Sequence, residues 1–375
     1  FFEVKDSPSI SLDGTDFTIS MWIKPQPRGD DEWLLEKQTG WKSGEYALYL
    51  TSSDNVVFQA NDTNTQETVI SGVPINVWSH IVVTYDGSAL SGYLNGEVSR
   101  TVSETLAIAD GSENLFIGSR AGSTLFYHGD LDQVEIYRKA LTDQQVVTNY
   151  LSVPLTRNYT FDQNVTSTTA GAVLDSSAGN NPGTLNQVNG SALPEWSSDG
   201  PVGGAYRFDG NGASITAPIV DFIRKDGVYT FSAWVKYEGK GATPYSTSTV
   251  FQNSYAGDDR CGASVHDTGN PASGRFSFGY YTGSGWVGKS GDIPKDSWVH
   301  VVGVNNVGSL SLYIDGVAQT DVAGPYVSVD ANLLYIGRNS ISSHNYDPFK
   351  GMLDNVQIFN RALTAAHAQA MYNQK

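Results

Sequence analysis

The sequence predicts an all-β protein that contains two tandem antiparallel β-sandwich domains. The first observation is a long internal repeat, in which WSHIVVTYDGSALSGYLNGEVS from Trp78 matches WVHVVGVNNVGSLSLYIDGVAQ from Trp298. A period of about 220 residues indicates two copies of a whole domain, since solenoid repeats run to only about 20–50 residues. The second observation is a series of short β-branched segments separated by turn residues, which is typical of β-sandwiches.

Each copy contains the same order of expected strands and turns. The segments HIVVTY and HVVGV are β-branched and are predicted strands. The next strands end at Asn95 and Asp315, each followed by glycine, which is the strongest short-range signal of a hairpin turn. The last strands, VEIY from Val134 and VQIF from Val356, alternate apolar and polar residues, as expected for a sheet with one solvated face.

The opening and the end of each copy also repeat. FTISMWIKP from Phe17 matches YTFSAWVKY from Tyr229. Only two segments look helical, 142–150 and 364–372, and each closes its copy. Their first residues are threonines, at positions where an N-cap residue would accept a free backbone N–H.

The repeat places the domain boundaries at 1–153 and 154–375, and both lengths are usual for a domain. In the second copy about 50 residues, 155–204, precede the point that matches position 1. The first sandwich is therefore expected to lack an N-terminal strand and loop. Two explanations stay open: a processed or shorter domain, and a homo-oligomer in which another copy's strand fills the gap by complementation at the N-terminus.

Composition excludes several classes of partner. The net charge of −16 and the isoelectric point near 4.6 argue against nucleic acid or an anionic membrane surface. No run of about 18 apolar residues occurs, so no membrane insertion is expected. The single cysteine, Cys261, excludes an internal disulfide.

The sequence also argues against an enzyme. Glycoside hydrolases need two carboxylates across the scissile bond, and the nearest pattern, Asp132-Gln-Val-Glu135, sends its carboxylates to opposite faces of a strand. The second copy has Gln357 in place of the glutamate. His80 and His300 recur at strand starts, where a core histidine is a simpler interpretation than a catalytic base. No catalytic residue is therefore predicted.

The order of these motifs resembles a known family. WSHIVV, YLNG, FIG and GDLDQVEIYRKALT in the first copy, with their counterparts in the second, are similar to the laminin-G-like (LamG) branch of the concanavalin A-like lectin/glucanase superfamily. The segments LDSSAGNNPGTL and YRFDG of the second copy resemble further motifs of that family. The resemblance implies a jelly roll of two curved antiparallel sheets in each domain, and a surface or secreted module that is often carbohydrate-binding or adhesive.

The resemblance also implies calcium, which the family often holds beside these motifs. Calcium takes about six to eight oxygen ligands from carboxylates, amides and carbonyls. The expected ligands in the second domain are Asp175 and Asn180 in the LDSSAGNN loop and Asp354 in GMLDNV. The first-domain counterpart, Asp132, has no such loop beside it, and calcium there is left open. The alternative is that Asp175 and Asp354 only cap turns.

The long insertions of the second copy are the expected binding loops, since loops on a rigid scaffold often carry binding. They supply aromatic rings that can pack on sugars and polar groups that can bind hydroxyls. The candidate ligand-binding residues are Tyr255, Asp258, Asp259, Arg260, Trp286 and Tyr346.

The sequence thus favours a binding protein of the extracellular space or cell surface, with a glycan or a cell-surface or matrix protein as partner. Two alternatives stay open. In the first, the tandem is a self-assembling structural subunit of a surface layer, filament or appendage. In the second, the two copies are accessory domains of a larger glycan-active enzyme.

Overall fold

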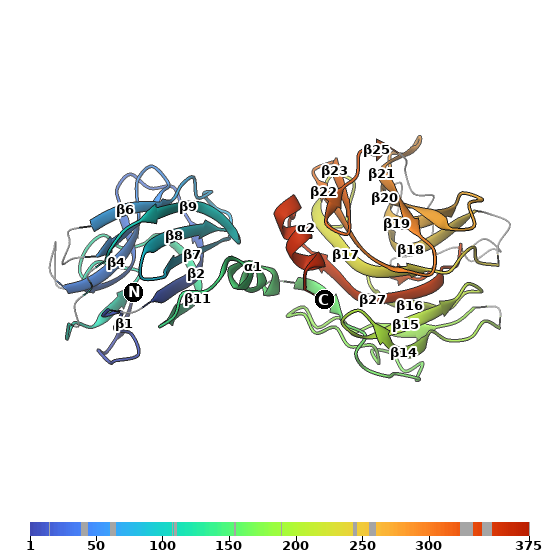
Figure 1. The fold of residues 1–375 in the computed structure, drawn as a ribbon, viewed down its shortest axis with the longest axis horizontal. Coiled ribbons are helices and arrows are strands. Elements are labelled where there is room, and N and C mark those ends of the chain that lie inside the picture. The colour runs from blue at the N-terminus through green and yellow to red at the C-terminus, as the bar shows by residue number, and fades with distance from the viewer. Residues whose placement is uncertain are drawn as a thin grey trace. The chain divides into compact units, whose positions relative to one another are not determined.

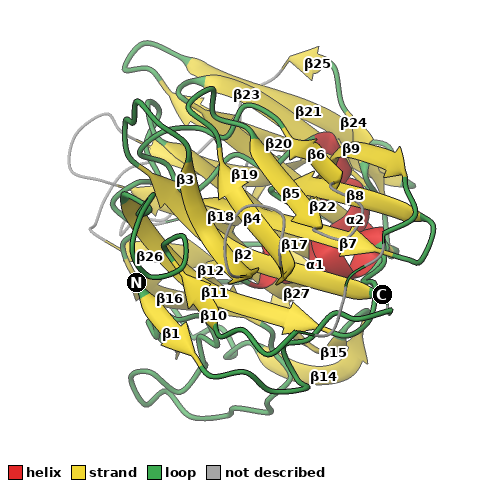
Figure 2. Cartoon of the chain, turned by 90° about the vertical axis from the view of Figure 1, so that its left-hand side faces the viewer, coloured by secondary structure: helices red, strands yellow, loops and turns green. Residues whose placement is uncertain are grey.

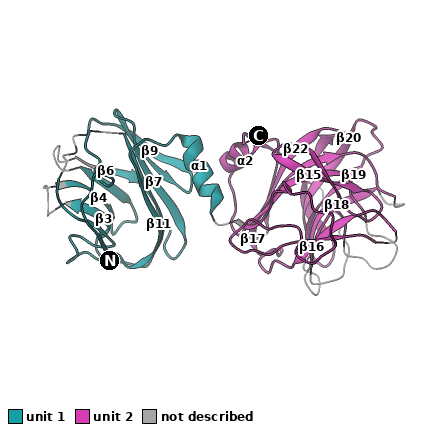
Figure 3. Ribbon diagram, turned by 90° about the horizontal axis from the view of Figure 1, so that it is seen from below, with its two compact units in different colours: residues 1–153 teal, residues 154–375 magenta. Residues whose placement is uncertain are grey.

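The chain folds into two compact units, Phe1–Val153 and Pro154–Lys375 (Figures 1 and 3). The computed structural model describes residues 1–14, 16–38, 44–60, 65–106, 108, 111–153, 155–188, 190–242, 246–254, 260–322, 333–339 and 347–374. Strands provide nearly all regular structure, and the helices α1 (Asp143–Ser152) and α2 (Ala365–Tyr372) each end a unit (Figure 2). The predicted all-β fold with two sandwich domains is confirmed.

The first unit packs a six-stranded sheet against a five-stranded sheet. In spatial order, the larger sheet contains β1 (Phe2–Val4), β10 (Leu115–Ile117), β3 (Glu32–Gln38), β4 (Gly44–Leu50), β5 (Val56–Ala60) and β6 (Thr65–Ile70). The smaller sheet contains β11 (Gly129–Tyr137), β2 (Phe17–Pro25), β7 (Ser79–Tyr85), β8 (Ala89–Leu94) and β9 (Glu97–Ser103).

The second unit packs two eight-stranded sheets against each other. One contains β14 (Glu195–Gly200), β15 (Gly203–Asp209), β27 (Lys350–Phe359), β17 (Val228–Tyr237), β22 (Trp298–Asn306), β23 (Ser309–Ile314) and β24 (Val317–Ala318), with β12 (Leu155–Tyr159) also pairing with β27. The other contains β13 (Thr184–Asn186), β16 (Ser214–Pro218), β26 (Leu333–Ile336), β18 (Thr247–Ser254), β19 (Arg260–Asp267), β20 (Ser273–Tyr281), β21 (Trp286–Pro294) and β25 (Asp321–Val322).

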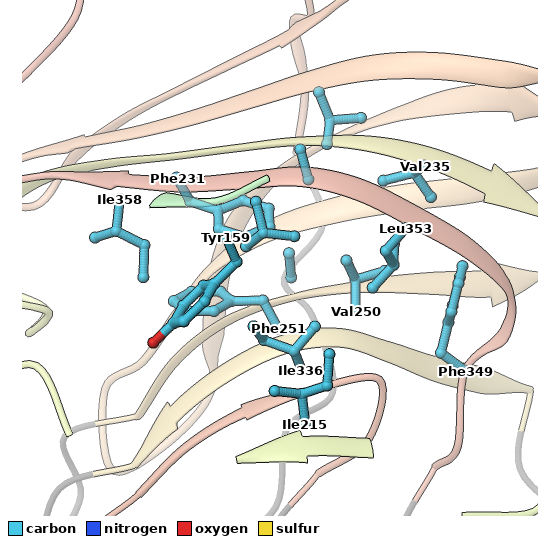
Figure 4. Close-up of a cluster of buried hydrophobic side chains, with 14 of the residues drawn as sticks. Tyr159, Ile215, Phe231, Val235, Val250, Phe251, Ile336, Phe349, Leu353 and Ile358 are labelled. Carbon is cyan, nitrogen blue, oxygen red and sulfur yellow. The ribbon is translucent and has the colours of Figure 1, made fainter. Parts of the chain in front are cut away.

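The core of the second unit lies between its two sheets (Figure 4). Phe231 on β17 stacks on Phe251 on β18, with ring centroids 4.5 Å apart. Full burial of one large apolar side chain contributes about 1.5–3 kcal/mol, so a core of this size holds the sheets in fixed positions. Further members of the cluster are Tyr159, Ile215, Val235, Val250, Ile336, Phe349, Leu353 and Ile358.

The turn and cap residues behave as the sequence predicts. Asn95 and Asp315 have φ values of 54° and 49°, and the glycines that follow them also have positive φ. This is the backbone of a type I′ hairpin turn, which requires positive φ at both central residues. Thr142 and Thr364 are the N-cap residues of α1 and α2, and each belongs to a capping box.

The two units differ at one sheet edge. In the second unit, β27 lies between β17 on one side and β12 and β15 on the other, and its Leu353 and Ile358 are fully buried. The equivalent strand β11 pairs only with β2 among the described residues, and its Leu131 and Ile136 are partly buried. Strand β11 is therefore an edge strand, whose outer backbone groups are open to pairing.

Candidate functional site

One arginine and two aromatic side chains lie together at one end of strands β19, β20 and β21. The Cζ atom of Arg260 is 4.7 Å from the centroid of the Tyr281 ring. The Tyr281 and Trp286 rings have centroids 5.1 Å apart and an interplanar angle of 50°. All three residues are partly exposed. These three residues are termed the aromatic–cation cluster.

Strand alternation and a short turn put the cluster together. Phe276 and Phe278 on β20 belong to the core, so Tyr281, at the opposite parity, faces away from it. Tyr281 is the direct cross-strand partner of Trp286, and such partners lie about 4.5–5.5 Å apart on one face of a sheet. The hairpin is closed by the N–H of Thr282, which donates to the Gly285 carbonyl at 2.9 Å.

This arrangement has the chemistry of a sugar-binding surface. Aromatic faces pack against apolar ring surfaces, and a guanidinium offers five N–H donors to hydroxyl oxygens. The cation–π contact holds the guanidinium of Arg260 over the ring of Tyr281. The three residues are partly exposed, while Nε of Arg260 is buried, so only the terminal nitrogens of the guanidinium could meet a ligand.

The structure brings two predicted ligand-binding residues, Arg260 and Trp286, into this cluster. Tyr281 is missing from the predicted set, although the alternation along β20 identifies it: Tyr280 takes the inward position and its neighbour the outward one. The other predicted ligand-binding residues lie outside the described residues: Tyr255, Asp258, Asp259 and Tyr346.

Asp175 organises the LDSSAGNN loop through its carboxylate. Its Oδ1 accepts the N–H groups of Asn158 and Ser177 at 2.8 and 2.9 Å, and its Oδ2 accepts the N–H of Asn181 at 2.8 Å. Asn180 has a φ of 42° and an exposed side chain. The described contacts of Asp175 are thus those of a residue that caps a turn.

Asp354 has different neighbours from Asp175. Its Oδ2 accepts the N–H of Val202 at 3.0 Å, while its buried Oδ1 has no hydrogen-bond partner among the described residues. Asp162 binds the same turn between β14 and β15, where its Oδ1 accepts the N–H of Gly204 at 3.0 Å. The structure thus brings Asp354 and Asp162 to one turn. Asp162 ends the segment RNYTFD, and sequence reasoning did not select it.

Asp354 is an acid in a place that disfavours its charge. Burial raises its pKa to about 7, and the negative charge of Asp162 adds to the rise, while the N–H groups of Val202 and Asn355 act in the opposite direction. A cation at this place would supply the missing partner of Oδ1 and neutralise both carboxylates. The described residues contain no group of three or more His, Cys, Asp or Glu side chains that could hold a metal ion, so these two carboxylates would need backbone or water oxygens as further ligands.

The counterpart in the first unit lacks this environment. Asp132 is exposed, and its Oδ1 accepts only the N–H of Gln133, at 2.8 Å, among the described contacts. No described strand pairs with the outer edge of β11, so no turn equivalent to that of β14 and β15 lies beside Asp132. The same motif therefore has different surroundings in the two units.

The repeated histidines are buried core residues. Nε2 of His80 lies 2.9 Å from Oγ of Ser20, and Nε2 of His300 lies 2.9 Å from Oγ of Ser232. The two histidines are 2% and 3% exposed, and each packs on a tryptophan of the neighbouring strand. A serine–histidine pair that solvent cannot reach cannot meet a substrate, so these pairs have a structural role.

Comparison with known families places this architecture. A laminin G family model, described as the concanavalin A-like lectin/glucanases superfamily, matches residues 4–147 and 209–369. The chain belongs to this superfamily. The resemblance that the sequence motifs carry is thereby confirmed for both copies. A sequence comparison with curated proteins finds no match.

Several solved structures are similar to parts of this superfamily member. One is domain 4 of AbnA, a GH43 extracellular arabinanase from Geobacillus stearothermophilus, solved in complex with arabinotriose. Its sequence identity is 22%, the match covers 58% of this chain and 98% of that chain, and the TM-score is 0.40. The CBM40 of a Ruminococcus gnavus IT-sialidase is 17% identical over 40% and 96%, with a TM-score of 0.33. Domains LG4-5 of the mouse laminin α1 chain are 13% identical over 96% and 88%, with a TM-score of 0.29.

The raised pKa of Asp354 predicts a pH dependence of stability in metal-free protein. The folded state holds the Asp354 proton more tightly than the unfolded state, so the associated stability is present below about pH 4 and is lost as the pH rises to about 7. The loss proceeds at up to about 1.4 kcal/mol per pH unit. Asp354→Asn removes this titration. In urea unfolding, the free energy of unfolding of the variant should therefore rise relative to that of the native protein between about pH 4.5 and 8.

The matched control is Asp221→Asn, which changes an exposed aspartate of the same unit. This control should retain the pH dependence of the native protein. Identical pH profiles for Asp354→Asn and the native protein would contradict the raised pKa.

Proposed function

We propose that this protein is a non-catalytic carbohydrate-binding or adhesive module, and that its second unit holds a glycan at the aromatic–cation cluster. The observation that carries the proposal is the placement of Arg260, Tyr281 and Trp286 side by side with partly exposed rings. Aromatic surface left in contact with water is costly unless a ligand covers it. A sugar covers the rings with its C–H face and offers hydroxyls to the guanidinium.

The placement of the acids and histidines supports binding rather than catalysis. The repeated histidines are buried, and Asp354 faces a backbone turn rather than an open cleft. The sequence expectation that Asp132 and Glu135 lie on opposite faces of their strand is wrong, because a bulge in β11 pairs them with Trp22 and Ser20 and so puts both acids on one face. The second unit has Gln357 in place of this glutamate. The proposed role therefore needs no reacting group.

We place this role in the extracellular space or at the cell surface, with a glycan or a cell-surface or matrix protein as the partner. Among the described residues, no helix combines the length and apolar character needed to cross a membrane. The net charge of −16 disfavours nucleic acid and anionic membrane surfaces as partners.

The aromatic–cation cluster predicts the effect of single truncations on glycan affinity. Trp286→Ala or Tyr281→Ala should weaken binding of a neutral oligosaccharide about tenfold, since each removes a stacking surface. A glycan array selects the ligand and isothermal titration measures its affinity. Trp78→Ala, which truncates an exposed tryptophan of the first unit, is the control. Unchanged affinity in both cluster variants would refute this location.

We propose further that the second unit binds one structural calcium ion at Asp354 and Asp162. Three observations support this site: the Oδ1 of Asp354 has no hydrogen-bond partner among the described residues, the carboxylate of Asp162 lies at the same turn, and the pKa of Asp354 is raised. A bound cation would stabilise the charged carboxylate and lower this pKa. Calcium prefers such oxygen donors. Bound there, the ion would tie the turn between β14 and β15 to β27. Asp175 and Asn180 would shape the adjacent loop, since backbone N–H groups occupy both oxygens of Asp175.

Calcium removal should therefore destabilise the second unit. A ligand at about 100 times its Kd stabilises the folded state by about 3 kcal/mol, and EDTA should remove that amount in a thermal melt. Asp162→Asn should abolish the calcium-dependent shift, while Asp132→Asn should retain it. Asp175→Ala should lower stability equally with and without calcium. A calcium shift lost in Asp175→Ala but retained in Asp162→Asn would place the ion in the loop instead.

The open edges of the first unit support a second function, assembly of copies into a filament. Strands β9 and β11 are the two edges of the five-stranded sheet. The β11 edge carries the acids Asp132 and Glu135. Strand β9 carries Glu97 and Arg100, and the half-exposed side chain of Arg100 forms an ion pair with Glu67 at 3.6 Å. Pairing β9 of one copy with β11 of the next would bring Arg100 toward the two acids, and a head-to-tail contact of this kind generates open chains.

Assembly should then depend on concentration and on the charge of β11. Sedimentation velocity should show growing species as the protein concentration rises, and Asp132→Lys combined with Glu135→Lys should weaken association about tenfold by opposing Arg100. Asp199→Lys, at an exposed site of the second unit, is the charge control. A monomer at every concentration would exclude this second function and leave glycan binding in place.

A further inference from the structure

A small polar cavity opens at one end of the second sandwich, where the strands of both sheets finish. Its volume is about 210 Å³. The end of β17 contributes Tyr237, the end of β19 contributes Asp267, and Lys295 follows β21. The loops between these strands add Lys240 and Asn270. Neither the aromatic–cation cluster nor the proposed calcium site uses any of these residues.

The hydroxyl of Tyr237 is an unexplained polar group in this wall. The residue is 1% exposed, and its hydroxyl oxygen has no hydrogen-bond partner among the described residues. The ring fills space that Gly274 leaves open, since a Cβ at Gly274 would lie 2.7 Å from Cε1 of the tyrosine. A buried hydroxyl without a partner costs about 1–3 kcal/mol. A ligand in the cavity would remove that cost.

The cavity also concentrates positive charge in an acidic protein. Lys240 is exposed and Lys295 is partly exposed, and both line the same space. Gly239 has a φ of 120° and leaves room for the ammonium group of Lys295. Any other residue at this position would place its Cβ about 3.3 Å from Nζ of Lys295. Burial and the charge of Asp267 raise the pKa of Tyr237 to about 12, so its hydroxyl keeps its proton and can donate.

The first unit provides an internal comparison at the same backbone position. The N–H of Asp296 donates to the Tyr237 carbonyl at 2.8 Å, and the N–H of Asn76 donates to the Pro25 carbonyl at 2.7 Å. The backbones thus match, but the side chains differ. The first unit has Pro25 in place of Tyr237 and Ile75 in place of Lys295. The donor groups of the cavity therefore belong to the second unit alone.

We propose that this cavity binds a monosaccharide unit that carries a carboxylate, such as a uronic acid residue of a glycan. The sugar carboxylate would accept hydrogen bonds from Lys240, Lys295 and the hydroxyl of Tyr237, while Asp267 and Asn270 would bind the ring hydroxyls. This proposal rests on the glycan-binding function and names an acidic sugar as part of its ligand. The volume is below the roughly 300 Å³ at which drug-sized pockets begin, which suits a single ring.

Asp267 decides between a sugar and a simple anion. Its carboxylate lies in the same cavity as the two ammonium groups and would repel an anion that offers no donors. A sugar ring presents hydroxyl donors beside its carboxylate, and these satisfy Asp267. Its Oδ1 already accepts the N–H of Gly269 at 2.9 Å, which keeps the acid in place.

The cavity and the aromatic–cation cluster can be tested separately. They lie at opposite ends of β19, with Arg260 at its first residue and Asp267 at its last. Seven residues of extended strand span about 23 Å. A substitution at one location therefore leaves the contacts of the other intact.

The experiment is a calorimetric titration of the whole 375-residue chain with glucuronate, glucose and acetate as separate probes. Glucuronate should bind at least tenfold more tightly than glucose or acetate. Lys295→Gln and Tyr237→Phe should each weaken glucuronate binding about tenfold. Lys225→Gln, at an exposed lysine of the same unit, should leave glucuronate affinity unchanged.

Tyr237→Phe keeps the result interpretable, because removing a hydroxyl without a partner should leave the melting temperature of the ligand-free protein unchanged or higher. If acetate binds as tightly as glucuronate, the assignment of a sugar is overturned. If glucose binds as tightly as glucuronate, the role of the lysines is overturned. No glucuronate binding up to about 10 mM would overturn the cavity proposal. Glucuronate affinity lost in Trp286→Ala but kept in Lys295→Gln would move the acidic sugar to the aromatic–cation cluster, which overturns this proposal and upholds the proposed function.

Discussion

The second unit depends on the pairing of strand β27 along both of its edges. Strands β12 and β15 bond to one edge and β17 to the other. This pairing buries the apolar residues of β27 and takes the carboxylate of Asp354 out of water. An acid in the interior of a sheet needs a compensating partner. The proposed metal site is thus a consequence of how the sheet closes.

The opposite sheet supplies the proposed binding chemistry because its strands are long and regular. Strands β19, β20 and β21 hold alternate residues in the core and release the others to the outer face. Their one end presents Arg260, Tyr281 and Trp286, and their other end borders the cavity beside Tyr237. A rigid core between the sheets keeps both places preformed, which lowers the entropic cost of binding.

The two units show how one repeat yields two surfaces. Both copies keep the hairpin turns, the capped helix and the buried serine–histidine pair. They differ where strands are added, since β27 is enclosed and β11 is an edge. The shared features depend on local sequence and on one sandwich core. The differing features depend on which strands reach the sheet edge.

The sequence by itself determined the all-β class, the tandem arrangement, the helix caps and the hairpin turns, because each depends on residues close together along the chain. It also selected Arg260 and Trp286 as candidate ligand-binding residues, and the structure places both in the aromatic–cation cluster. Only the tertiary structure decided that Asp162, rather than Asp175, shares a turn with Asp354, and that Tyr237 and Lys295 line one cavity. These groups are far apart in sequence, and the register of strand pairing that brings them together follows from burial over the whole core.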